Sequence, residues 1–153
     1  MKNFLKEHMV LFLFVILLSL LFILWARIMV HELSATSHTQ NLSTTAARVR
    51  CLAHFGWEVD PVGETKRTAT IPDPLDAVYT EYNKLQLVCG FDLKEHCGKT
   101  VICYTYPVLN FPYQTDEAVF VNILVDNGRL IAGDCMSRSL DGFMLPLDRS
   151  LIP

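Results

Sequence analysis

Two aspartates near the carboxyl end are the best candidates for acid–base chemistry in this chain. Asp134 follows Gly133 at the end of an expected strand, and Asp141 precedes Gly142 beyond a turn. Two carboxyl groups can act as general acid and general base when their environments separate their pKa values. Aspartate is also common at turns, where its side chain accepts backbone N–H groups. We expect the turn-capping role, with Asp134 and Asp141 kept as candidate binding residues.

The sequence predicts neither a metal site nor a bound cofactor. The chain has five cysteines: Cys51, Cys89, Cys97, Cys103 and Cys135. The spacing of the middle three around His96 matches no common zinc pattern, and C-x-x-C is absent. An odd number outside the cytoplasm leaves at least one cysteine without an intramolecular partner, and sequence alone selects no pair. We expect the thiols to pack as small apolar side chains.

Other residue types point to binding rather than to catalysis. Tyr79, Tyr82, Tyr104 and Tyr106 supply aromatic surface with polar tips, which suits a peptide or glycan ligand but also suits a core. The chain contains no nucleophile-elbow, zinc-protease, Walker or dinucleotide-binding sequence. We therefore expect these tyrosines to pack in the core of a domain that is not an enzyme.

Helices and strands must position these residues. A first helix is expected to begin at Thr44 or Thr45 and to end at Gly56, because hydroxyl side chains cap helix starts and glycine favours helix ends. Residues 64–71 alternate weakly and are rich in threonine, which indicates a polar edge strand.

A second helix is predicted from Asp73 as N-cap and Pro74 as the first helical residue, and Gly90 is its expected end. Its apolar stripe, which we expect to face the core, comprises Leu75, Val78, Tyr79, Tyr82, Leu85 and Val88.

Three strands are predicted after this helix, over residues 100–108, 118–125 and 130–136. The middle one is apolar on both faces apart from Asn122, so it should be central. Asn127-Gly128 predicts a type I′ hairpin turn. The element order predicts an α+β fold: a small antiparallel sheet of three or four strands with two helices on one face.

A long apolar run precedes this domain. The 18 residues from Met9 to Ala26 carry no charge and include Ser19 as their one polar residue. Such a helix is long enough to cross a hydrocarbon core of about 30 Å. Lys2 and Lys6 favour a cytoplasmic amino terminus. A cleaved signal peptide is the alternative, although its apolar region is usually shorter and is followed by small residues.

The sequence therefore predicts four segments. They are a cytoplasmic tail (1–8), a single transmembrane helix (9–30), a polar spacer (31–44) and an extracytoplasmic α+β domain (45–153). The formal net charge of −3 argues against a nucleic-acid partner. The expected partners are the membrane and an unidentified protein, peptide or envelope ligand.

Short motifs in the extracytoplasmic part carry a resemblance. In chain order they are Gly56-Trp57-Glu58-Val59, Ile71-Pro72, Gly90-Phe91-Asp92-Leu93, Tyr104-Thr105-Tyr106-Pro107, Asn122-Ile123-Leu124-Val125, Gly133-Asp134 and Leu140-Asp141-Gly142-Phe143-Met144. Over residues 45–146 the chain resembles an uncharacterised family of membrane-anchored or exported domains from Gram-positive, Clostridia-type bacteria. The resemblance implies a bacterial cell-surface domain and no activity. Cys89, Cys97 and Cys103 do not belong to the family's pattern.

These observations predict a single-pass, membrane-tethered extracytoplasmic module that binds a protein, peptide or envelope component without catalysis. Two alternatives stay open. The chain could be an accessory subunit that docks in a membrane complex through its transmembrane helix, or a small envelope hydrolase that uses the region of Asp134 and Asp141.

Overall fold

The structure is a computed structural model that describes residues 18–23, 25, 41–139 and 141–152. The chain divides into two compact units, Met1–Ser37 and His38–Pro153. Residues 18–23 and 25 of the first unit are helical and exposed. No helix within the described ranges is both long enough and apolar enough to cross a membrane. Most of the predicted tail, transmembrane helix and spacer lies outside these ranges, so the tether stays a prediction.

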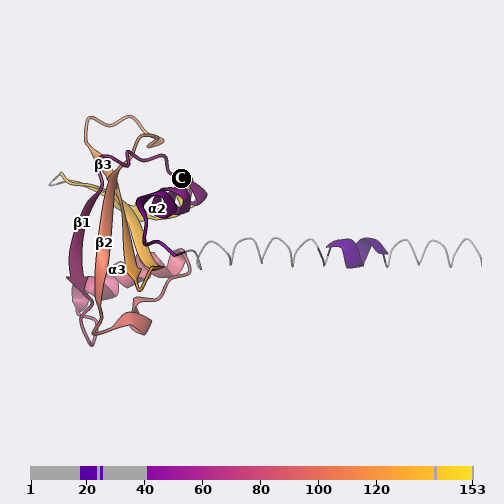
Figure 1. The fold of residues 1–153 in the computed structure, drawn as a ribbon, viewed down its shortest axis with the longest axis horizontal. Coiled ribbons are helices and arrows are strands. Elements are labelled where there is room, and N and C mark those ends of the chain that lie inside the picture. The colour runs from indigo at the N-terminus through magenta and orange to yellow at the C-terminus, as the bar shows by residue number, and fades with distance from the viewer. Residues whose placement is uncertain (1–17, 24, 26–40, 140, 153) are drawn as a thin grey trace, which may run out of the picture. The chain divides into compact units, whose positions relative to one another are not determined.

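The second unit is built on one antiparallel sheet. Its elements are α2 (Thr45–His54), β1 (Thr65–Thr70), α3 (Ala77–Val88), the 3-10 helix η1 (Leu93–His96), β2 (Thr100–Pro107), β3 (Val119–Asp126), β4 (Arg129–Ser137), β5 (Met144–Pro146) and the 3-10 helix η2 (Arg149–Leu151). The strands lie in the order β1-β2-β3-β4-β5, and each pairs antiparallel with the next (Figure 1). The predicted α+β class with an antiparallel sheet is confirmed.

The sheet has five strands rather than three or four. The additional strand, β5, has only three residues and lies beyond the last strand that the sequence predicts. It pairs with β4 through Met136↔Met144 and Asp134↔Pro146. A strand this short shows no periodicity that could reveal it, and only its pairing with β4 makes it a strand.

β3 is central and is buried on both faces, as its sequence predicts. Val121 and Ile123 on one face have no exposed surface, and Leu124 on the other face is also buried. The turn after β3 has positive φ angles at Asn127 (49°) and Gly128 (79°). These angles confirm the predicted type I′ turn, which requires φ > 0 at both central residues.

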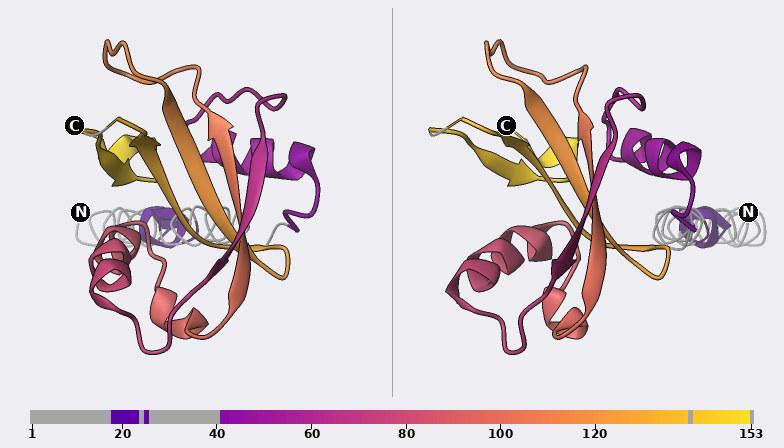
Figure 2. Two further views of the ribbon diagram at one scale, coloured as in Figure 1. Left: turned by 90° about the vertical axis from the view of Figure 1, so that its left-hand side faces the viewer. Right: turned by 60° about the vertical axis from the view of Figure 1, so that its left-hand side comes forward.

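The two α-helices cover opposite faces of the sheet, so the prediction that both lie on one face is wrong. Figure 2 shows α2 and α3 on either side of the strands. Leu52 of α2 belongs to the core that contains Tyr106 and Ile123. Tyr82 of α3 packs against a second core, which contains Leu124. The physical reason is that a central strand with two apolar faces needs a cover on each of them.

α3 begins later than predicted. Asp76, not Asp73, is its N-cap, and the Asp76 carboxylate accepts a 2.8 Å hydrogen bond from the Tyr79 N–H. The predicted apolar stripe is also partly wrong, because Val78 and Val88 are 74% and 61% exposed. Leu75, Tyr79 and Tyr82 of that stripe do pack against the core.

Two polar side chains, Asn83 and Gln86, are the buried residues of α3. The Asn83 oxygen accepts a 2.7 Å hydrogen bond from the Leu93 N–H and so holds η1. The Gln86 oxygen accepts a 2.8 Å hydrogen bond from the Gly133 N–H in β4. The face of α3 that packs on the sheet is therefore the face that carries Asn83 and Gln86, and not the whole predicted apolar stripe.

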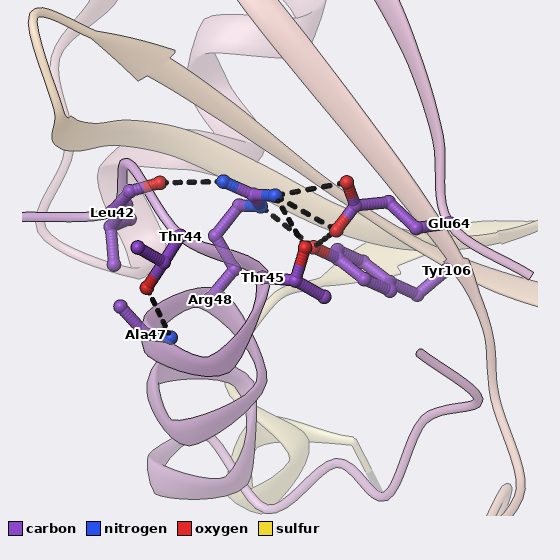
Figure 3. A network of polar contacts seen from close by, with 7 residues as sticks. All are labelled: Leu42, Thr44, Thr45, Ala47, Arg48, Glu64 and Tyr106. Carbon is purple, nitrogen blue, oxygen red and sulfur yellow. Dashed lines mark hydrogen bonds and ion pairs between the residues drawn. The ribbon is translucent and has the colours of Figure 1, made fainter. Parts of the chain in front are cut away.

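An ion pair between the buried Arg48 and the half-buried Glu64 connects α2 to the sheet (Figure 3). Arg48 is 4% exposed, and one of its terminal nitrogens lies 2.9 Å from both carboxylate oxygens of Glu64. Its Nε donates a 2.7 Å hydrogen bond to the Tyr106 hydroxyl, which donates in turn to Glu64. A further nitrogen of Arg48 donates to the Leu42 carbonyl at 2.8 Å. The guanidinium carbon also lies 3.8 Å from the centre of the Tyr104 ring.

The neighbours of Glu64 shift the pKa of its carboxyl group. Burial on its own would raise the pKa of Glu64, but the hydrogen bonds from Tyr106 and Arg48 outweigh it and hold this pKa below its usual range. The ionised form of Glu64 is therefore favoured, and this carboxylate is the counter-ion of Arg48 at neutral pH.

Replacing Arg48 should destabilise the domain strongly. We expect Arg48→Met to lower the free energy of unfolding by about 2 kcal/mol, because it leaves the half-buried Glu64 carboxylate, the Tyr106 hydroxyl and the Leu42 carbonyl without their donor. Urea unfolding of the full chain, followed by tryptophan fluorescence, measures the change. Arg50→Met is the matched control, because Arg50 is exposed on the same helix and should change stability by less than about 0.5 kcal/mol. Equal losses in the two variants would contradict a structural role for the pair.

Candidate functional site

A cavity of about 510 Å³ lies between α3 and the sheet. All five strands and α3 contribute to its lining, which consists of Arg67, Ala69, Val78, Tyr79, Glu81, Tyr82, Leu85, Cys103, Asn122, Leu124, Asp134, Met136 and Met144. Most of this surface is apolar, and a few polar groups converge on it. Ligand sites in proteins commonly have this composition and a volume of about 300–1,000 Å³.

The cavity exists because a single 12-residue helix covers a five-stranded sheet face. α3 packs mainly against β4 and β5. Ala69 and Arg67 on the edge strand β1 therefore line the open part of that face. Val78 and Met144, both largely exposed, line the cavity as well.

A row of polar side chains crosses the sheet on this face. Thr105, Asn122 and Asp134 are paired neighbours on β2, β3 and β4. The Thr105 hydroxyl donates to the Asn122 oxygen at 2.6 Å, and the Asn122 amide donates to Asp134 Oδ2 at 2.8 Å. From α3, the Tyr82 hydroxyl donates to Asp134 Oδ1 at 2.7 Å. Both carboxylate oxygens of Asp134 thus accept a hydrogen bond, and the chain of donors ends on this residue.

Asp134 is a buried acid without a counter-ion. It is 3% exposed, and within the described part of the chain no Lys, Arg or His nitrogen lies within 4.0 Å of it. Burial raises the pKa of Asp134, although the hydrogen bonds from Tyr82 and Asn122 and the charge of Arg67 act to lower it. Burial and the nearby Asp134 carboxylate also raise the pKa of Tyr82, so this phenol keeps its proton.

Arg67 supplies the positive charge of the cavity. It is exposed on β1 opposite Cys103 in the register, and its positive charge opposes the rise that burial causes in the pKa of the Cys103 thiol. None of the described carboxylates lies within 4.0 Å of its guanidinium nitrogens. Three charged residues therefore line the cavity. Asp134 and Arg67 have no ion-pair partner among the described residues, whereas the exposed Glu81 pairs with Lys84 at 2.7 Å.

The structure separates the two aspartates that the sequence singles out. Asp134 lies within β4 rather than at its end, and its carboxylate bonds with Tyr82 and Asn122. Asp141 is an exposed turn residue beyond β4 and does not line the cavity.

The predicted tyrosines divide between the two faces of the sheet. Tyr79 and Tyr82 line the cavity, whereas Tyr104 and Tyr106 pack in the core beneath α2. Arg67 is a cavity residue that the sequence does not reveal. Asn122, the one polar residue inside the apolar pattern of β3, is the signal that could have located the polar row.

The cysteines pack as small side chains, as expected. All five are free, and Cys51, Cys103 and Cys135 are buried. Burial raises the pKa of the Cys51 thiol to about 11 and that of Cys135 to about 12, so these thiols stay protonated and unreactive. No group of three or more His, Cys, Asp or Glu residues that could hold a metal ion occurs in the described ranges.

Comparisons with protein-family models, with curated proteins and with solved structures found no match to this chain. The resemblance to the bacterial cell-surface family therefore stays a prediction.

The burial of Asp134 should be visible in the pH dependence of stability. Because its pKa is raised in the folded state, the folded protein binds this proton more tightly than the unfolded chain does. The stabilisation is present below the unfolded pKa of about 3.9 and is lost as pH rises through the folded pKa. We expect the free energy of unfolding of the wild type minus that of Asp134→Asn to fall between about pH 3 and pH 7.

Urea unfolding of the two full-length proteins at several pH values measures this difference. The ionisable neighbours of Asp134 are Arg67, Tyr82, Cys103 and Cys135, and none of them changes its charge in this pH range, because the pKa values of the phenol and the thiols are raised. Asp141→Asn is the matched control and should show no such trend. A difference that is constant or rises with pH would contradict the burial of Asp134.

Proposed function

We propose that this chain is a membrane-tethered binding module whose ligand occupies the cavity beside α3. In this proposal residues 9–30 anchor the chain in the membrane, residues 31–44 are a spacer, and the α+β domain binds its ligand outside the cytoplasm. The uncharged run from Met9 to Ala26 supports the anchor. Membership of the family that residues 45–146 resemble is part of the same proposal.

The observation that carries the proposal is the Asp134 carboxylate inside an apolar cavity. An unpaired buried charge destabilises a fold, and well-packed apolar residues in its place are often at least as stable. Proteins tolerate such groups most often where binding or catalysis requires them. The cavity itself has the size and the mixed lining of a ligand site.

Binding has more support than hydrolysis. The hydrolase alternative needs a second carboxyl group to share acid–base work with Asp134, and Asp141 lies outside the cavity lining. Glu81, the other acid in that lining, is exposed and forms an ion pair with Lys84 at 2.7 Å. Two hydrogen bonds, from Tyr82 and Asn122, fix the position of the Asp134 carboxylate, as ligand recognition requires.

Methionine methyl groups give a direct test, because Met136 and Met144 line the cavity. We expect the neutral probe N-acetyl-phenylalaninamide to cause saturable chemical-shift changes at these two methyl signals. The experiment uses the full-length protein in lipid nanodiscs, labelled with 13C-methyl methionine.

A pair of variants on β1 provides the control. Ala69→Phe places a ring in the cavity and should weaken probe binding at least about tenfold, whereas Thr68→Phe places it on the other face of the exposed strand. Absence of saturable shifts in the wild type, or equal weakening by both variants, would contradict the cavity as the ligand site.

A further inference from the structure

We infer that the ligand is a small amphipathic zwitterion: an apolar body that carries an ammonium group bound by Asp134 and a carboxylate bound by Arg67. Amino acids with large apolar side chains belong to this chemical class. The inference rests on the proposed function, because it specifies the ligand of the same cavity.

The Asp134 end of the cavity calls for a hydrogen-bond donor with a positive charge. Thr105, Asn122 and Tyr82 form two chains of donors that both end on the carboxylate. An ionised carboxylate has about four lone-pair sites and two of them are used here, so the remaining capacity is for donors. An ammonium group would supply such donors. It would also supply a positively charged partner, which Asp134 does not have within 4.0 Å among the described residues.

The Arg67 end calls for the opposite group. A guanidinium has five N–H donors in a planar fork that matches a carboxylate. Arg67 lines the cavity, is exposed and has no described carboxylate within 4.0 Å of its guanidinium nitrogens. A ligand with only a positive charge would be repelled here, and a ligand with only a negative charge would be repelled by Asp134. A zwitterion satisfies both ends.

The rest of the cavity lining suits an apolar body. Leu85 and Tyr79 of α3, Leu124 of β3 and the flexible side chains of Met136 and Met144 line the cavity. Unbranched methionine side chains adapt to the shape of an apolar ligand. The cavity volume of about 510 Å³ is ample for a single amino acid.

Four forms of one amino acid separate the contributions of charge. L-Phenylalanine carries both charges, phenylalaninamide only the ammonium group, N-acetyl-phenylalanine only the carboxylate, and N-acetyl-phenylalaninamide neither. Titration of each into the full-length protein, read from the Met136 and Met144 methyl signals, gives four dissociation constants. We expect L-phenylalanine to bind at least about tenfold more tightly than each of the other three.

Variants assign each charge to its residue. Asp134→Asn should abolish the advantage of L-phenylalanine over N-acetyl-phenylalanine, and Arg67→Gln should abolish its advantage over phenylalaninamide. The matched controls Asp141→Asn and Arg50→Gln, both at exposed positions outside the cavity, should leave both ratios unchanged. Because Arg67 is exposed on the edge strand, its variant is expected to fold even if Asp134→Asn does not.

The outcomes distinguish this inference from the proposed function. If the neutral probe saturates the cavity signals and L-phenylalanine binds no more tightly, the zwitterion inference is wrong and the cavity remains the ligand site. If phenylalaninamide binds more tightly than L-phenylalanine, the ligand is a simple cation and the role of Arg67 is wrong. If none of the four compounds shifts the two methyl signals, both proposals fail.

Discussion

A buried carboxylate needs hydrogen-bond donors in place of the water it has lost. On the α3 face of this sheet, Asp134 is the residue that needs them. Its position in β4 brings it beside Asn122 in the register, and its second oxygen requires a donor from above the sheet. Tyr82 supplies that donor and thereby adds a contact between α3 and the strands to those made by Asn83 and Gln86. The polar floor of the cavity follows from the way in which this one carboxylate is hydrogen-bonded.

The buried charged residues on the two faces of the sheet differ in whether they have an ion-pair partner. Beneath α2, Arg48 is neutralised by Glu64 and oriented by Tyr106, so the charge is balanced within the fold. Beneath α3, Asp134 has hydrogen bonds but no ion-pair partner among the described residues. A charge with an ion-pair partner inside the fold is typical of a structural role. A charge without such a partner beside a cavity favours binding of a ligand with the opposite charge. This contrast is the main reason for assigning function to the α3 face.

Local signals in the sequence predict much of the fold. The apolar character of residues 118–125 on both faces predicts the central strand, and Asn127-Gly128 predicts the hairpin turn. Thr44 and Thr45 predict the start of α2, and the structure selects Thr44 as the N-cap, whose hydroxyl accepts the Ala47 N–H at 3.2 Å. Each of these features depends on interactions within a few residues, so the chain's own pattern is sufficient.

Features that depend on distant partners could not be predicted in this way. The buried face of α3 is set by hydrogen bonds that Asn83 accepts from the Leu93 N–H in η1 and Gln86 accepts from the Gly133 N–H in β4. The sequence of the helix itself does not indicate these partners. Likewise, sequence proximity favours Asp141 as the neighbour of Asp134, but the cross-strand register selects Asn122 instead. Of the two aspartates that the sequence selects as binding candidates, only Asp134 lines the cavity, and its neighbours there are brought together by the tertiary structure.

The most direct measurement for this account is the titration of the Asp134 carboxyl carbon by 13C NMR in the full-length protein, with and without L-phenylalanine. We predict a pKa above the usual aspartate range in the free protein, because burial dominates, and a lower pKa in the bound state, because an ammonium group favours the ionised carboxylate. An ordinary pKa that the ligand leaves unchanged would contradict both the burial of Asp134 and its role in binding.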